Sequence, residues 1–286
     1  MSRRTLLNLG LFLLVILLGL ITLFEPGKEP PTELPTLISL QREDIHKVRI
    51  DRHDAESIVL EKEAGRWHMT HPVRAGVSSY RINSILKLAG TKSLGSHSGS
   101  GKDLQPFGLE KPRLHVTLNG GLTLAFGNNT PLDHRRYLLL GDTIHLIADS
   151  FYYQLIGDFT TFIDTALLPP DSQIAGIELP TLRLNRIENR WQVEPEPEHY
   201  SADQAATLIE AWQQARALEV KAWRGGKGEA ITLHITNRAE PLHFLITARS
   251  PELVLARLDL GIEYYLAEHF AAGLLTLQQP VTEGSE

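Results

Sequence analysis

Two pairs of residues in this 286-residue sequence have side chains that could support acid–base or metal chemistry. His68 and His71 lie three residues apart, a spacing at which two imidazoles on a helix could share a metal ion. Asp133 precedes His134, and a carboxylate beside a group that titrates near neutral pH could move protons. The two spaced histidines, however, lie between an alternating segment and Pro72, and no third ligand follows at matching spacing. We expect solvated or capping histidines there, which leaves Asp133 and His134 as the only local candidates for catalysis.

The glycine- and serine-rich segment Gly90–Lys111 resembles a phosphate-binding loop and a hydrolase nucleophile elbow in composition, but it matches neither motif. A phosphate-binding loop needs Gly-Lys followed by Ser or Thr, but Gly101 and Lys102 precede Asp103. A hydrolase elbow needs a serine centred between spaced glycines, and His97 holds that place here. The composition favours a flexible surface loop.

Other polar residues have simpler interpretations. His115, His145 and His234 alternate with apolar neighbours on expected strands, so an exposed sheet face is expected for them. Prolines prevent a helix in the acidic run Glu194–His199, which favours a solvated loop over a cation site. We therefore predict no catalytic, cofactor-binding or metal-ligating set of residues, and no cofactor.

The elements that would position these residues form an internal repeat. Trp67–Leu88 and Trp191–Trp212 each pass from a tryptophan through a proline and a serine into an apolar helical pattern. The tryptophans are 124 residues apart and the serines, Ser78 and Ser201, are 123 residues apart. Because the tryptophans recur at the same place, we expect them to pack against the following helix rather than to stack on sugars.

Both copies predict a helix with one buried face. In the first copy Ser78 would cap the helix, and in the second Ser201 and Gln204 would form a capping box. The residues expected on the buried faces are Ile82, Ile85, Leu86 and Ala89, then Ala205, Leu208, Ile209 and Trp212.

Alternating segments around these helices predict antiparallel strands. In the first copy they form hairpins over residues 45–60, 114–126 and 136–147, followed by a short helix over 149–156. In the second they cover residues 182–184, 231–235, 242–246, 253–258 and 261–267, with a closing helix over 268–277. The predicted fold is therefore α+β, with an antiparallel sheet and one main helix in each of two tandem, duplicated modules.

The N-terminus predicts membrane attachment. Thr5–Phe24 carries no charge and would span about 30 Å as a helix. A cleaved signal peptide is the alternative, but a small-residue cleavage site is missing, and the lack of cysteine excludes a lipoprotein. Arg3 and Arg4 precede the span, so the positive-inside rule puts the N-terminus in the cytoplasm and the bulk outside, in the periplasm of a two-membrane bacterium.

The predicted organisation has five parts. They are an N-terminal membrane anchor (residues 1–24), a Pro-rich stalk (25–36), a first α+β module (37–165), a second (166–280) and a polar tail (281–286). The net charge of −6 and the lack of a long basic run argue against a nucleic-acid partner.

A family resemblance lies in the first module. Phe107–Pro112 and the strands that follow it resemble the core signature of the domain of unknown function 4340 family. The positions that carry the resemblance are Gly108, Leu109, Pro112, Gly127 and Tyr137. It covers residues 40–155 well and the second half loosely, where the turn is missing. The family has no agreed activity, so the resemblance implies no chemistry, and its auxiliary membrane relatives in ABC-type transport or gliding systems imply an accessory role only by analogy.

Three functions of different classes remain open. The leading hypothesis is a non-enzymatic accessory or scaffold protein that binds protein partners of an envelope or ABC-type transport complex. The second is an envelope enzyme acting on glycan or lipid headgroups in a cleft between modules, which needs paired carboxylates or a His–carboxylate pair in a deep pocket. The third is a glycan-binding module using exposed Trp67 and Trp191.

Overall fold

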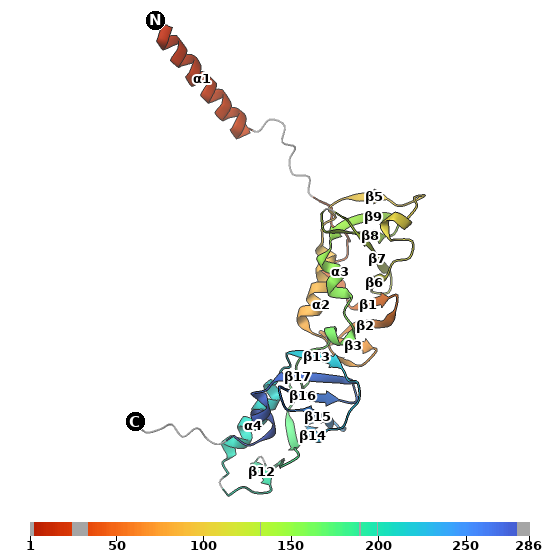
Figure 1. Cartoon of the computed structure of the whole chain (residues 1–286), viewed down its shortest axis with the longest axis vertical. Helices are drawn as coiled ribbons and strands as arrows, with labels where there is room; N and C mark the ends of the chain where they lie inside the picture. Colours follow the sequence, from red (N-terminus) through yellow and green to blue (C-terminus); the bar gives the residue numbers. More distant parts are fainter. Residues whose placement is uncertain (1–2, 25–33, 132, 189, 199, 279–286) are drawn as a thin grey trace. The chain divides into compact units, whose positions relative to one another are not determined.

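The computed structural model describes residues 3–24, 34–131, 133–188, 190–198 and 200–278 (Figure 1). The chain divides into two compact units, Met1–Pro35 and Thr36–Glu286, and α1 (Arg3–Phe24) belongs to the first. Within the described part of the chain, no helix is long and apolar enough to cross a membrane. The anchor therefore stays a proposal. The expected polar tail and most of the expected stalk lie outside the described residues.

The second unit contains two antiparallel sheets, here called module 1 and module 2 with their helices. The described strands of module 1 form a nine-stranded sheet in the order β4-β3-β2-β1-β6-β7-β8-β9-β5. Their bounds are β1 (Lys47–Arg52), β2 (Ala55–Glu63), β3 (Arg66–His71), β4 (Ala75–Gly76), β5 (Ser96–Ser98), β6 (Leu114–Leu118), β7 (Leu122–Asn129), β8 (Arg135–Leu140) and β9 (Thr143–Ala148).

The described strands of module 2 form an eight-stranded sheet in the order β12-β11-β10-β14-β15-β16-β17-β13. Their bounds are β10 (Ile174–Glu178), β11 (Arg183–Ile187), β12 (Arg190–Glu194), β13 (Glu219–Ala222), β14 (Glu229–Ile235), β15 (Leu242–Ala248), β16 (Glu252–Arg257) and β17 (Ile262–Ala267). Apart from the two-residue β4, the two sheets have the same topology, with β5 and β13 at corresponding edges. The α+β class and the two tandem antiparallel modules are confirmed.

Hydrogen bonds at the corresponding edges match in detail. The Leu94 N–H donates to the Leu146 carbonyl at 2.8 Å, and the Leu218 N–H donates to the Tyr265 carbonyl at 2.8 Å. The two donors are 124 residues apart, the same separation as the two tryptophans. The repeat seen at the strand-to-helix junction therefore extends to the far edge of each sheet.

Helices pack on one face of each sheet (Figure 1). Module 1 has α2 (Ser79–Leu86), continued by a 3-10 turn to Gly90, and α3 (Ser150–Leu155); module 2 has α4 (Ala202–Gln214) and α5 (Phe270–Leu275). Every apolar residue expected on the buried faces of α2 with its 3-10 turn and of α4 is buried, and Trp212 is fully so. These side chains join the sheet residues in the hydrophobic core.

One of the two expected helix caps is present. In module 2 the Ser201 Oγ accepts from the Gln204 N–H, and the Gln204 Oε1 accepts from the Ser201 N–H at 2.9 Å, which confirms the capping box. In module 1 the Ser78 side chain makes no capping bond, so that prediction is wrong. The two backbones differ: φ and ψ are −121° and 146° at Ser201 but −56° and 118° at Ser78, whose N–H donates to the Phe162 carbonyl.

Several strands were missing from the sequence interpretation, among them β5, β10 and β13. β5 lies inside the segment expected to be a surface loop, and its backbone pairs with β9 although its side chains are exposed. β13 consists of alternating charged and small residues, and Gly176 interrupts the apolar alternation of β10. Backbone pairing at the sheet edge accounts for β5, whose side chains are exposed, whereas β13 also buries Val220.

Candidate functional site

His68 and His71 do not converge. Both lie on β3, which bulges between Met69 and His71, so that His68 lies opposite Glu61 and His71 lies opposite Val59 of β2. The His71 Nε2 lies 3.2 Å from Glu56, whereas His68 lines a pocket between the modules. Across the described residues, no group of three or more His, Cys, Asp or Glu side chains is placed to hold a metal ion.

Asp133 and His134 do not form a catalytic pair in this structure. Asp133 lies 4.0 Å from the Arg135 guanidinium, and no described hydrogen bond or ion pair joins it to His134. His134 is exposed with φ at 48°, and its carbonyl accepts from the Asp149 N–H at 3.2 Å. This loop therefore uses the His134 backbone to turn into β8, while both side chains face solvent.

The strand histidines lie in different surroundings. His234 is exposed and lies 3.7 Å from Glu178, as expected for an open sheet face. His145 is half-buried, which corrects the expectation of an exposed face, because Ser93 beside β5 covers it and lies 3.0 Å from its Nδ1. Burial lowers the pKa of His145 below its ordinary value. His115 is also half-buried and lies opposite Asp51 across the β1–β6 pair.

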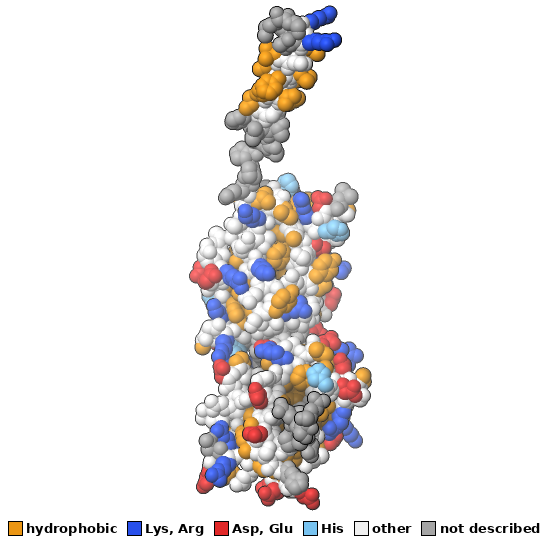
Figure 2. Space-filling view, turned by 90° about the vertical axis from the view of Figure 1, so that its left-hand side faces the viewer, with side chains coloured by type: hydrophobic (Ala, Val, Ile, Leu, Met, Phe, Trp, Pro, Cys, Tyr) orange, Lys and Arg blue, Asp and Glu red, His pale blue; other side chains and the backbone are white. Residues whose placement is uncertain are grey.

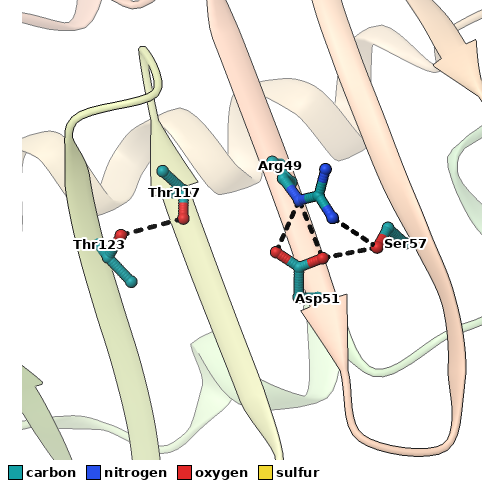
Figure 3. A network of polar contacts seen from close by, with 5 residues as sticks. All are labelled: Arg49, Asp51, Ser57, Thr117 and Thr123. Atoms are coloured by element: carbon teal, nitrogen blue, oxygen red, sulfur yellow. Dashed lines mark hydrogen bonds and ion pairs between the residues drawn. The ribbon is translucent and has the colours of Figure 1, made fainter.

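A polar network covers part of the open face of module 1 (Figure 3). The Arg49 Nε donates to both Asp51 oxygens at 2.9 and 2.8 Å, and the Ser57 Oγ donates to Asp51 at 2.5 Å. The hydrogen bond from Arg49 lowers the pKa of Asp51, against the opposing effect of burial. The Ser57 Oγ also accepts from the Arg49 Nη2 at 3.1 Å, so Ser57 bonds to both members of the Arg49–Asp51 ion pair. Thr117 and Thr123 extend the network at 3.1 Å.

The turn that carries the family signature, Phe107–Pro112, packs closely against its neighbouring strands. Gly108 has φ at 67°, and a Cβ there would overlap the Asn128 side chain. A Cβ at Gly127 would overlap the Phe107 carbonyl oxygen and lie 2.9 Å from the buried Leu109 side chain. The Phe107 ring also meets Tyr137 edge-on, with centroids 5.0 Å apart. The signature glycines thus let the turn lie directly against β7 and β8.

A buried ion pair between Arg136 and Asp149 also contacts the Gly127 backbone. The Arg136 Nε donates to Asp149 at 2.5 Å, and its second nitrogen donates to the Gly127 carbonyl at 2.5 Å. The guanidinium lies 3.6 Å from the centre of the Tyr152 ring. Because two of its nitrogens bond to buried groups and its guanidinium stacks on Tyr152, Arg136 stabilises the fold.

The two modules are joined through backbone pairing by residues 163–168, here called the joint. Ile163 forms a bridge with Val77 of module 1, and Ala166 forms a bridge with Arg216 of module 2. The Asp164 N–H donates to the Gly76 carbonyl at 2.9 Å, and the Asp164 carboxylate accepts from Arg216 at 2.9 Å. The chain between the sheets therefore acts as a short shared strand, which fixes one module against the other.

A cavity of about 330 Å³, here called the joint pocket, opens beside this connection. Its polar lining comes from both modules, and its apolar lining comes chiefly from the joint. The polar residues are His68, Arg74, Asp164, Arg238, Arg257, Asp259 and Tyr264.

The charges in the joint pocket are largely paired. Arg257 is buried and donates to both oxygens of Asp259 at 3.0 and 2.6 Å. Burial opposes ionisation of Asp259, but Arg257 lowers its pKa overall. Burial raises the pKa of Tyr264. The pocket is thus of ligand size, and both of its carboxylates already have arginine partners.

The two tryptophans are half-buried and pack against the core. The Trp191 carbonyl also accepts from the Tyr200 hydroxyl at 3.2 Å. Glu194, the first residue of the acidic run, is an exposed residue at the end of β12, opposite Arg183. Neither feature brings together a set of ligands.

Comparison with known proteins gives one family match. The model of the family described as "Domain of unknown function (DUF4340)" matches residues 67–232, which begin at Trp67 and end within β14. No curated protein and no solved structure matches the chain. The match reaches further into module 2 than the sequence resemblance indicated.

Proposed function

Since the chain belongs to the DUF4340 family, we propose that it is a membrane-anchored, extracytoplasmic accessory or scaffold protein that binds protein partners in the cell envelope. The observation that carries this proposal is the joint, which pairs two sheets of the same topology into one compact unit. Signature residues such as Gly127 serve the packing of that unit. A stiff body with repeated surfaces suits a protein that holds partners at fixed positions.

The surface is compatible with protein partners. Figure 2 shows acidic and basic side chains interspersed on the face in view. Such a mixture favours protein contacts over the phosphate backbone of nucleic acid, which needs concentrated positive charge.

Attachment to the inner membrane, with the N-terminus inside, is part of the proposal. It is supported by the uncharged run Thr5–Phe24 behind Arg3 and Arg4. Alkaline extraction of membranes should leave the chain in the pellet, and external protease should reach the modules only after the outer barrier is opened. Release by alkali would overturn the anchor.

The scaffold proposal is tested by capture from crosslinked membranes. A tagged full chain should recover the same partner proteins reproducibly, whereas a tagged control containing only residues 1–36 should not. Recovery of no partner above that control would remove the main support for a scaffold.

The joint pocket favours a second candidate, an enzyme or receptor for a small headgroup. The pocket lies between the modules and holds His68 together with Asp164 and Asp259. Replacing Asp259 with Asn and, separately, Asp164 with Asn tests this candidate. A normal envelope phenotype in both variants would count against it.

A further inference from the structure

Module 1 has an open groove where the chain enters the sheet, here called the entry groove. It encloses about 490 Å³ and is mostly apolar. Its lining residues are Leu37, Ile38, Ser39, Leu40, Asp44, Leu118, Asn119, Gly121, Leu122 and Leu140. Asp44 is the one charged side chain in this lining, and no cationic partner of its carboxylate occurs among the described residues.

The repeat shows which part of module 2 corresponds to this groove. The Leu37 N–H donates to the Thr91 carbonyl at 2.7 Å, and the Leu167 N–H donates to the Ala215 carbonyl at 3.2 Å. The two acceptors are 124 residues apart, the separation of the tryptophans. Leu37–Leu40 and Leu167–Pro170 are therefore equivalent entry segments.

The neighbouring turns agree with this equivalence. After β6 the Asn119 N–H donates to the Lys47 carbonyl at 2.9 Å, and after β14 the Thr236 N–H donates to the Gln173 carbonyl at 2.8 Å. In module 2 the entry segment and Arg238, just after this turn, line the joint pocket, while Thr236 itself lines a neighbouring pocket with Pro169 and Pro170. The entry groove and the module 2 side of the joint pocket therefore share the entry segment and overlap in the repeated fold.

The entry groove and the joint pocket differ in what lies beside the entry segment. In the joint pocket it is the β3–β4 end of module 1, which contributes His68, Arg74, Ala75 and Gly76. The two modules lie close together here: a Cβ added at Gly76 would make ordinary van der Waals contact with the Asp164 Cβ, at 3.8 Å. Among the described residues, none from module 2 lines the entry groove.

We propose that the entry groove docks a sheet end of the β3–β4 type carried by another polypeptide, with small residues at its tip and a basic side chain beside them. Such a segment would repeat the internal joint, and its cation would meet the unpaired Asp44 carboxylate. The proposal rests on the scaffold function and specifies where and by what chemistry a partner binds.

The test is site-specific photo-crosslinking in intact membranes. A photoreactive amino acid replaces Leu122 in the groove or, as the matched control, Thr123, the next residue of β7, which points to the opposite face. We expect a partner adduct at 122 and none at 123, with the attached partner peptide containing Gly or Ala beside Lys or Arg. Leu122→Asp should lower the yield of chemically crosslinked partner at least tenfold, and Asp44→Lys should lower it more than Glu43→Lys.

The other outcomes separate the two proposals. If chemical crosslinking recovers a partner but the adduct forms at 123, or at neither position, the entry groove is excluded and the scaffold stands. An adduct with a second copy of the chain would likewise overturn the proposal that a different polypeptide docks in the entry groove. If neither method recovers any partner, both proposals fail. Unchanged thermal unfolding of the Leu122→Asp chain shows that lost capture reflects the groove and not the fold.

Discussion

Gly127→Ala provides the sharpest test of a structural role for the family signature. The added methyl group would overlap the Phe107 carbonyl oxygen, a backbone atom that cannot rotate away, and crowd Leu109 at 2.9 Å. Overpacking of this kind costs about 1–3 kcal/mol. If the turn lifts to relieve it, Leu109, now 3% exposed, loses its burial at a cost of about 1.5–3 kcal/mol. The less costly of these two responses sets the loss, so the free energy of unfolding should fall by about 1–3 kcal/mol.

The assay is urea unfolding of the full chain in detergent, followed by tryptophan fluorescence. Gly121→Ala is the matched control, because a Cβ there meets no atom within 4 Å and its φ is not in the left-handed region. The control should unfold within about 0.5 kcal/mol of the parent. Equal midpoints for Gly127→Ala and the parent would refute the close approach of the turn to β7.

Three further predictions address the joint, a cap and a buried histidine. Asp164→Ala removes the partner of Arg216 and an acceptor for the Ala166 N–H. It should lower the free energy of unfolding by about 1–2 kcal/mol and broaden the distribution of distances between spin labels on the two sheets. An unchanged distribution would argue against a stiff joint. Ser201→Ala should cost about 1 kcal/mol in urea unfolding through loss of the capping box, whereas a neutral result would mean that α4 does not need the cap. Because the pKa of His145 is lowered by burial from its ordinary 6.5, the unfolded chain protonates first, so stability is full above about pH 6.5 and falls as the pH drops toward the folded pKa. His145→Gln should flatten that decline, and an unchanged pH profile would remove His145 as its source.

Side-chain patterns predicted the parts of the fold that depend on burial. The apolar spacing of Leu208 and Trp212 identified the main helix of module 2, and alternation identified the hairpin of β6 and β7. β5 escaped because its exposed side chains carry no such pattern, and β13 because its four residues are too few to show one clearly; pairing with the neighbouring strand defines both. The repeat spacing of 124 residues relates the two strands, so it could have located one of them only after the other was known.

The candidate site was less predictable, because it depends on contacts between distant segments. His68 was identified, but as one of a spaced pair, whereas His68 lines the joint pocket and His71 lies beside Glu56. The joint pocket also needs Arg257 and Tyr264, which are almost 200 residues further along the chain and had no local motif to mark them. Asp133 and His134 showed the opposite error, since adjacency in sequence did not bring their side chains together.

The scaffold proposal is tested most directly by the amount of partner held per chain in crosslinked membranes. Quantitative mass spectrometry of the captured complex should give a fixed ratio of partner to chain across expression levels, and the ratio should be unchanged when Asp133 and His134 are both replaced by alanine. A ratio that falls to the level of the residue 1–36 control, or that collapses in the double variant, would contradict a scaffold.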